Sequence, residues 1–301
     1  MTALNGNKLL LTGSAGLLGE ALIDKLCGRF SLIAVYNNNP PVSKCEGYIK
    51  YQADLADEAQ AEDAVDKLKP DIIVNSAAWV DVDGCESDRE RAWKSNYKVV
   101  ENLVNSTCQK GTYLIQISTD YIFNGKDHPG RIDDRPDPLN YYGQTKLMAE
   151  EYIRRNHPNY LIVRTCALMA DPKRGKTNLL NYFYDNLKAG RQVVAPDDIY
   201  ANPIWIHNLA ELIAEALERH LTGILHMGGM DHISRYEFGK ILADVFGFDK
   251  ELVKPVSADR QRRPAKRPQY AGLDMEQSKG IFKTEILPVR KALMKIKRVI
   301  K

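Results

Sequence analysis

The sequence predicts an α/β protein built on a doubly wound parallel sheet, with a smaller lobe formed by its C-terminal part. Through the first half of its 301 residues, short and almost wholly apolar runs alternate with segments of helical length. Strands that are apolar along their whole length are typical of a parallel sheet covered by helices on both faces. Right-handed crossovers between such strands give the doubly wound arrangement.

The expected elements follow one another in a regular order. We expect strands at residues 8–12, 32–36, 48–52, 71–75, 113–118 and 160–164. Helices are expected between them at residues 17–26, 59–68, 89–108 and 141–155. Beyond about residue 165 the alternation loosens, and helices are expected at 179–187, 209–220 and 236–246, with an amphipathic surface helix at 290–301. The chain therefore divides into residues 1–165 and residues 166–301, and the second part can return strands to the main sheet.

The composition excludes several classes of protein. A net charge of +3 gives no reason to expect a nucleic acid or a membrane as partner. The five cysteines lack C-x-x-C spacing, as expected of free thiols in a reducing compartment, and the six histidines lack the spacing of metal ligands. We expect no metal site. Because the N-terminus lacks a secretory apolar run and no segment reaches membrane-spanning length, we expect a cytoplasmic protein.

A glycine-rich turn follows the first expected strand and opens the first expected helix. Its sequence, TGSAGLLG, spaces Gly13, Gly16 and Gly19 as G-x-x-G-x-x-G. Glycines there let the backbone turn sharply and approach the pyrophosphate of a dinucleotide, which then lies at the helix N-terminus. The alternative is a tight turn with close helix–strand packing, but the strand–turn–helix context favours the dinucleotide. The candidate cofactor-binding residues are Gly13, Ala15, Gly16, Leu17, Leu18, Gly19, Asn37, Asp54, Leu55, Ser76, Ala77, Ala78, Tyr142 and Lys146.

The second expected strand bears on the choice of cofactor. It ends in Tyr36 followed by three asparagines, Asn37 to Asn39, with neither an acid nor an arginine. An acidic residue at this point would bind the ribose 2′-hydroxyl of NAD and repel the 2′-phosphate of NADP. Its absence gives a small preference for NADP(H) over NAD(H). Residues 1–165 are therefore the predicted NAD(P)-binding domain, and residues 166–301 the lobe that mainly binds substrate.

A candidate catalytic set of three residues lies further along the chain. Tyr142 and Lys146 stand four residues apart on an expected helix, and therefore on one helical face. A nearby ammonium is expected to lower the pKa of a phenol, which could then protonate a carbonyl oxygen while a nicotinamide delivers hydride. Thr119, at the end of the preceding strand, can hydrogen-bond the same oxygen. Alone, Y-x-x-x-K is more often a surface helix pair; the glycine turn and Thr119 favour catalysis. Tyr141 is adjacent but does not share the face of Lys146.

These segments resemble the extended short-chain dehydrogenase/reductases, and within them the dTDP-4-dehydrorhamnose reductase family. The likeness rests on LLTGSAGLLG (10–19), DIIVNSAAWVDVDGCE (71–86), ISTDYIFNG (117–125) and PLNYYGQTKLMAEE (138–151), and weaker echoes extend it over nearly the whole chain. The resemblance implies a Rossmann domain, a triad of Thr119, Tyr142 and Lys146, and a structural role for Asn96. It also implies NAD(P)H-dependent reduction of the C4 ketone of a nucleotide-activated sugar, with dTDP-L-rhamnose as product.

The candidate substrate-binding residues are Asp120, Tyr121, Phe123, Asn178, Trp205 and Arg267. Arg267 belongs to a basic run at 260–267 that either contacts the substrate diphosphate or is a solvated loop. Trp205 either lines the cleft or packs in the core. The chain departs from the family pattern at 198–204, where Ile199 and Ile204 replace polar residues, and this leaves the identity of the sugar open.

A different class of function is also open. The chain is similar to the β-subunit family of methionine adenosyltransferase, which shares the fold and much of the triad but acts as a regulatory partner. An intact triad does not separate the two. An epimerase or dehydratase of the same superfamily is less favoured because of the STDYIF segment. The fold is also compatible with a homodimer.

Overall fold

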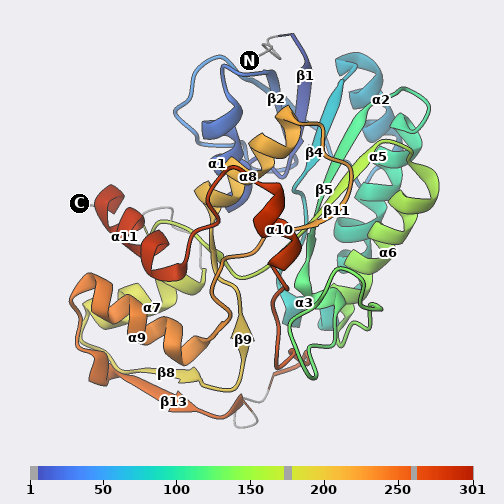
Figure 1. Ribbon diagram of the computed structural model, residues 1–301. Helices are drawn as coiled ribbons and strands as arrows, with labels where there is room; N and C mark the ends of the chain where they lie inside the picture. Colours follow the sequence, from blue (N-terminus) through green and yellow to red (C-terminus); the bar gives the residue numbers. More distant parts are fainter. Residues whose placement is uncertain (1–5, 173–177, 259–262, 301) are drawn as a thin grey trace.

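The computed structural model describes residues 6–172, 178–258 and 263–300 of the chain. Its centre is a seven-stranded sheet in which every neighbouring pair is parallel (Figure 1). In spatial order its strands are β11 (Gly223–His226), β6 (Tyr160–Thr165), β5 (Tyr113–Thr119), β4 (Ile72–Asn75), β1 (Lys8–Thr12), β2 (Ser31–Tyr36) and β3 (Ile49–Gln52). The chain runs outward from β1 to β3 and then outward in the other direction from β4. The predicted doubly wound parallel sheet is confirmed.

Two layers of helices cover the sheet. On one face lie α1 (Leu17–Leu26) and α8 (Ile206–Glu218), which share an apolar core with Leu9 and Leu11 of β1. On the other lie α2 (Glu58–Leu68), α5 (Val99–Thr107) and α6 (Tyr141–Asn156), which pack with Leu10 (Figure 1). Successive β1 side chains therefore enter opposite cores, which explains why the strand is apolar along its length.

The helix expected at 89–108 is present but not uniform. It consists of α4 (Arg89–Trp93), a π-helical turn (Lys94–Lys98) and α5. The π-helical turn buries Asn96, whose amide accepts from the Trp79 N–H at 2.7 Å and donates to the Thr145 hydroxyl at 3.1 Å. Asn96 thus ties the segment after β4 to α6.

The smaller part of the molecule gathers segments from the second half of the chain (lower left in Figure 1). The helices α7 (Leu179–Lys188), α9 (Arg235–Phe246) and α11 (Val289–Ile300) share one apolar cluster with the parallel pair β8 (Val193–Pro196) and β13 (Val253–Val256). Short pairs join β7 (Leu168–Met169) to β10 (Ile204–Trp205) and β9 (Tyr200–Ala201) to β12 (Ile233–Ser234). The second half also supplies α8 and β11 to the main sheet.

Two further short α-helices are α3 (Val82–Ser87) and α10 (Glu276–Ile281), and Asp120–Ile122 and Lys250–Leu252 form 3₁₀ turns. α11 is amphipathic as expected, with Val289, Ala292, Leu293 and Ile296 buried. Over the described ranges, none of the helices is long and apolar enough to cross a membrane.

Candidate active site

The glycine turn lies between β1 and α1, against the end of β4. Gly13 has φ of +60°, and a Cβ atom there would lie 2.6 Å from the Ala77 nitrogen. A Cβ atom on Gly19 would lie 2.2 Å from the Gly13 carbonyl oxygen. The turn therefore needs glycine at both positions, for a left-handed backbone at the first and for close packing of α1 at the second. The free N–H groups at the start of α1 can face an anion.

A groove of about 430 Å³ continues from the glycine turn across the ends of β1, β2 and β4. It brings together nine of the predicted cofactor-binding residues: Gly13, Ala15, Gly16, Asn37, Asp54, Leu55, Ser76, Ala77 and Ala78. Arg91 and Ser95 of the segment after β4 also line it. Sequence reasoning missed both because nothing in the local pattern near the start of the long predicted helix marks these two side chains as facing the groove.

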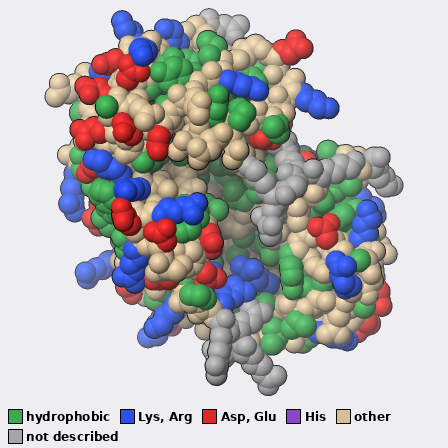
Figure 2. Space-filling view, turned by 180° about the vertical axis from the view of Figure 1, so that it is seen from behind, with side chains coloured by type: hydrophobic (Ala, Val, Ile, Leu, Met, Phe, Trp, Pro, Cys, Tyr) green, Lys and Arg blue, Asp and Glu red, His purple; other side chains and the backbone are tan. Residues whose placement is uncertain are grey.

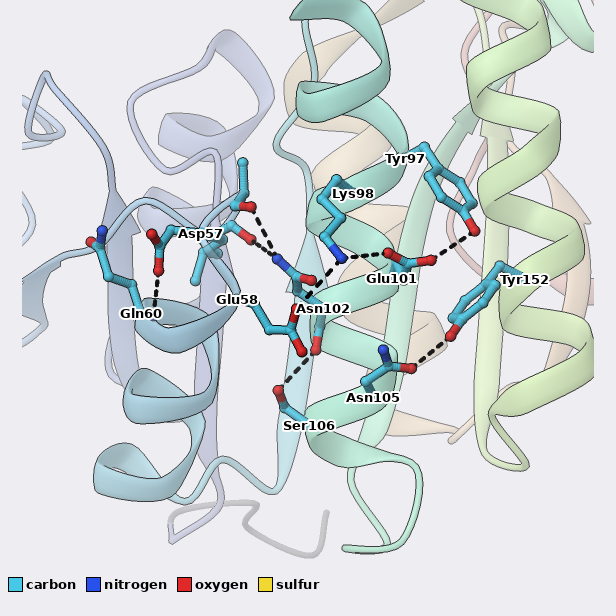
Figure 3. Close-up of polar contacts among 12 residues, drawn as sticks. Asp57, Glu58, Gln60, Tyr97, Lys98, Glu101, Asn102, Asn105, Ser106 and Tyr152 are labelled. Atoms are coloured by element: carbon cyan, nitrogen blue, oxygen red, sulfur yellow. Dashed lines mark hydrogen bonds and ion pairs between the residues drawn. The ribbon is translucent and has the colours of Figure 1, made fainter. Parts of the chain in front are cut away.

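Hydrogen bonds hold the far wall of this groove in place. The buried Asn102 amide of α5 donates to the carbonyl oxygens of Leu55 and Ala56, at 3.0 and 3.2 Å. Gln60 accepts from the Asp54 N–H at 3.0 Å. Figure 3 shows Asn102 pointing from α5 toward this loop, beside the ion pair between Lys98 and Glu101. The loop that carries Asp54 and Leu55 is thus fixed by α2 and α5.

A second cavity, of about 550 Å³, shares Gly13, Gly16, Ser76 and Ala78 with the groove. The two form one continuous site along the carboxyl ends of the parallel strands, where open α/β sheets bind ligands. Figure 2 shows this hollow between the larger and smaller parts of the molecule. Of the predicted residues, Leu17, Leu18, Gly19, Thr119, Asp120, Tyr121, Tyr142, Lys146 and Asn178 line the second cavity.

The candidate triad meets in this cavity. Thr119 is the last residue of β5, and its hydroxyl makes a hydrogen bond with the Tyr142 phenol. Tyr142 is in the first turn of α6, which Asn140 caps by accepting from the Gly143 N–H at 2.9 Å. Gly143 permits close packing, since a Cβ atom there would lie 2.2 Å from the Tyr121 carbonyl oxygen. Tyr141 instead lies under the Arg89 guanidinium, which is 4.8 Å from its ring centroid.

The lowered pKa that the i, i+4 spacing predicts for Tyr142 is not found in this structure. Burial raises the pKa of the Tyr142 phenol above its ordinary value, although the hydrogen bond with Thr119 opposes the rise. Burial also lowers the pKa of Lys146 to about 8, opposed by the Glu150 carboxylate. The Lys146 ammonium donates to the Ile117 carbonyl oxygen at 2.7 Å. Desolvation by the closely packed protein thus outweighs the attraction that the i, i+4 spacing suggested.

Three predicted substrate residues lie outside the described cavity lining. Phe123 packs against His226, with ring centroids 6.1 Å apart. The Trp205 indole donates to the Asp171 carboxylate at 3.3 Å. Arg267 forms an ion pair with Asp83 of α3 at 3.0 Å. Each has a packing or pairing role that explains its position. Residues 260–262 of the basic run lie outside the described residues.

The smaller part contributes Ile199, which the sequence had singled out, and two residues that it had not, Tyr200 and Arg235. Ile199, Tyr200 and Arg235 line the second cavity, as does Cys166 after β6. Ile204 does not line the cavity with Ile199, because it is buried in the core shared by α1 and α8. Arg235 was not expected in the site, because nothing in its neighbourhood along the chain distinguishes it from any first residue of a capped helix. Only the β9–β12 pairing, made across a long stretch of chain, brings it to the cavity.

Comparison with known proteins agrees with this geometry over the whole chain. Residues 7–300 match the RmlD substrate binding domain family. The probable low-salt glycan biosynthesis reductase Agl14 of Haloferax volcanii is 30% identical over 277 residues, covering 90% of each chain. The structure of a hypothetical dTDP-4-dehydrorhamnose reductase from Sulfolobus tokodaii is 35% identical, with a TM-score of 0.83 over 93% of this chain and 96% of that one.

The comparison also finds relatives among the regulatory subunits that the sequence left open as the alternative. The methionine adenosyltransferase 2 subunit beta of Xenopus tropicalis is 28% identical over 263 residues, covering 84% of this chain and 76% of that protein. The family match extends from the first strand through the last helix, and it joins the glycine turn, the triad and the smaller part in one pattern. The chain therefore belongs to the RmlD substrate binding domain family of extended short-chain dehydrogenase/reductases, as the sequence predicted.

Proposed function

We propose that this protein reduces the C4 ketone of a nucleotide-activated 6-deoxy sugar, with dTDP-4-dehydro-L-rhamnose as the first candidate substrate and dTDP-L-rhamnose as product. Membership of the family makes the chain an NAD(P)-dependent oxidoreductase. The observation that supports the finer proposal is the meeting of Thr119, Tyr142 and Lys146 in a cavity continuous with the groove of the glycine turn.

The residues of the groove fit a nicotinamide dinucleotide. The left-handed turn at Gly13 leads into the start of α1, where backbone N–H groups can bind the pyrophosphate, and the wall at Asp54 and Leu55 can hold the adenosine. When bound, the cofactor supplies hydride to the carbonyl carbon. Asn37 to Asn39, which follow β2, provide no carboxylate that would repel a 2′-phosphate, so we propose NADP(H) as the preferred form.

Each residue of the triad has a role in proton transfer. The raised pKa of Tyr142 keeps its phenol protonated near neutral pH, which is the form that can donate a proton to the carbonyl oxygen. Thr119 can hydrogen-bond the same oxygen and orient it. Lys146, still largely cationic at neutral pH, stabilises the phenolate that remains after donation. Burial excludes water from this exchange.

The test is oxidation of NADPH with a panel of 4-keto nucleotide-sugars. We expect turnover with at least one member and loss of that turnover in Tyr142→Phe. If every member of the panel is inert while NADPH binds, the reductase proposal is overturned.

The alternative is a regulatory subunit, and the similarity to the methionine adenosyltransferase subunit supports it. That function predicts cofactor binding without turnover, together with a stable complex with a methionine adenosyltransferase catalytic subunit in gel filtration.

A further inference from the structure

Arg235 lies on the wall of the second cavity that the smaller part provides. It is the first residue of α9, and its backbone is firmly placed. The Arg235 N–H donates to the Ile199 carbonyl oxygen at 3.2 Å. Ser234 before it caps the helix in a reciprocal arrangement with Glu237, at 3.1 and 2.8 Å. The partly buried Arg235 side chain shares the cavity lining with Asp120, Tyr121 and Tyr142.

Within the described part of the chain, no hydrogen bond or ion pair connects the Arg235 guanidinium to a carboxylate. Asp120 is the nearby acid, but its two oxygens already accept from the Thr119 hydroxyl at 3.1 Å and the Gly272 N–H at 2.9 Å. Burial raises the pKa of Asp120 to about 6, so its carboxylate is still mostly charged at neutral pH and acts on Arg235 electrostatically, without a direct ion pair. Arg235 therefore lines the cavity as a cation that no carboxylate of the described residues contacts.

Two further arginines approach the same region. Burial, followed by the charges of Arg235 and Arg267, lowers the pKa of Arg263. Arg235, Arg263 and Arg267 also each act to lower the pKa of the Tyr121 phenol, although burial raises it overall. Asp83 balances Arg267 through their ion pair. Figure 2 shows basic side chains inside the lower part of the hollow. Three arginines near two acids, Asp83 and Asp120, leave a positive potential that favours an anion in the cavity.

The chemistry of guanidinium groups narrows the choice of anion. Their planar fork of N–H donors matches the oxygens of phosphate, and several of them can share one diphosphate. The cofactor also carries a diphosphate, but the glycine turn and the start of α1 already form a site for it. Arg235 belongs to a different helix, in the smaller part, and Tyr142 lines the same cavity.

We propose that Arg235 binds the diphosphate of the nucleotide-sugar substrate, and that this contact holds the sugar ketone at Tyr142. This inference rests on the proposed function and names the part of the substrate that the smaller part recognises. It also predicts that the enzyme discriminates against a free 4-keto sugar, since such a sugar lacks the group that Arg235 binds.

The test measures binding separately from turnover. The probes are dTDP, UDP and thymidine, titrated by calorimetry into protein saturated with NADPH. We expect at least one nucleoside diphosphate to bind, and Arg235→Met to weaken it roughly tenfold to hundredfold, as loss of a charge-assisted hydrogen bond would. Arg235→Lys should retain part of the affinity. Thymidine, which lacks phosphate, should bind equally to wild type and to Arg235→Met.

The control is Lys240→Met on the same helix. Lys240 pairs with Glu251 at 3.4 Å, outside the cavity lining, so its loss should leave diphosphate binding unchanged. Affinity for NADPH should also be unchanged in Arg235→Met. The inference is overturned if Arg235→Met binds nucleoside diphosphates as wild type does, if it loses NADPH instead, or if wild type binds neither dTDP nor UDP. In each case the turnover assay with the sugar panel still decides independently whether the protein is a reductase.

Discussion

The Glu150 carboxylate acts on the Lys146 ammonium from one helical turn further along α6, and it opposes the fall in pKa that burial imposes on that lysine. Both side chains are almost fully buried. Glu150 is itself held by Arg164 of β6 at 2.8 Å and by the Ser118 hydroxyl at 2.5 Å. The charge state of the candidate catalytic lysine thus depends on a buried network that extends from α6 to the sheet.

This relationship predicts the alkaline limit of activity. Lys146 acts as a cation, and burial lowers its pKa to about 8, so its contribution is present below that pH and lost as pH rises through it. Tyr142 does not set this limit, because its pKa is raised above the ordinary value for tyrosine. We expect kcat/KM to fall as pH rises through about 8. A profile that stays flat to the ordinary pKa of lysine would contradict this assignment.

Glu150→Gln offers an independent test of the same network. Removing the carboxylate takes away the interaction that raises the pKa of Lys146, so the alkaline limit should move to lower pH. The variant also leaves Arg164 without its carboxylate, and breaking a buried pair costs about 3–5 kcal/mol. Profiles should therefore be recorded at a temperature where circular dichroism shows the variant folded. An unshifted limit in folded protein would mean that Glu150 does not tune Lys146.

Substitution in the glycine turn separates steric from conformational effects. Gly13→Ala places a Cβ atom 2.6 Å from the Ala77 nitrogen and also strains a φ of +60°. Gly28→Ala is the matched control, since φ is +77° there but nothing lies within 4 Å of the added atom. The control should lose only about 1–2 kcal/mol of unfolding free energy. Gly13→Ala should lose more and should weaken NADPH binding, as measured by thermal unfolding and calorimetry. Equal losses in both variants would show that close packing at Gly13 is unimportant.

Much of the main sheet could be predicted from local pattern, because its strands are buried on both faces. β1 is an example, with Leu9, Leu10 and Leu11 fully buried between two cores. The π-helical turn was not predictable from local pattern, and it holds Asn96 in long-range contact with Trp79 and Thr145. A residue period alone cannot reveal such a contact.

The site likewise contains residues that the sequence could predict and residues that only the tertiary structure reveals. The glycine turn, Thr119, Tyr142 and Lys146 carry their spacing in the sequence, and all of them line the continuous groove and cavity. Arg235 reaches the cavity only through the pairing of β9 with β12. Burial, which decides the pKa values of Tyr142 and Lys146, depends on the packing of the whole molecule and is invisible to spacing.

The cofactor preference can be tested at Asn37, which lines the groove at the end of β2. Asn37→Asp introduces a carboxylate that can bind a ribose 2′-hydroxyl and repels a 2′-phosphate. We expect the variant to lose affinity for NADPH and to keep or gain affinity for NADH, measured by fluorescence titration. Asn39→Asp, in the same run but further along the chain, shows how strongly the effect depends on position. The preference is disproved if wild type already binds NADH more tightly than NADPH.

The role of Tyr142 gives the most direct test of the proposed reaction. Tyr142→Phe removes the phenolic hydroxyl and leaves the ring in its contact with Tyr121, where the ring centroids are 6.1 Å apart. Turnover of a 4-keto nucleotide-sugar at saturating NADPH should fall by about 10²–10⁴, the usual contribution of general acid–base catalysis.

Tyr141→Phe is the control, because its ring lies beside Arg89 and outside the described cavity lining. Its turnover should stay near that of wild type. If Tyr141→Phe is inactive and Tyr142→Phe is active, the proton donor has been assigned to the wrong tyrosine. If both variants keep full turnover, the phenol is not the acid, and Thr119 or Lys146 must supply the proton.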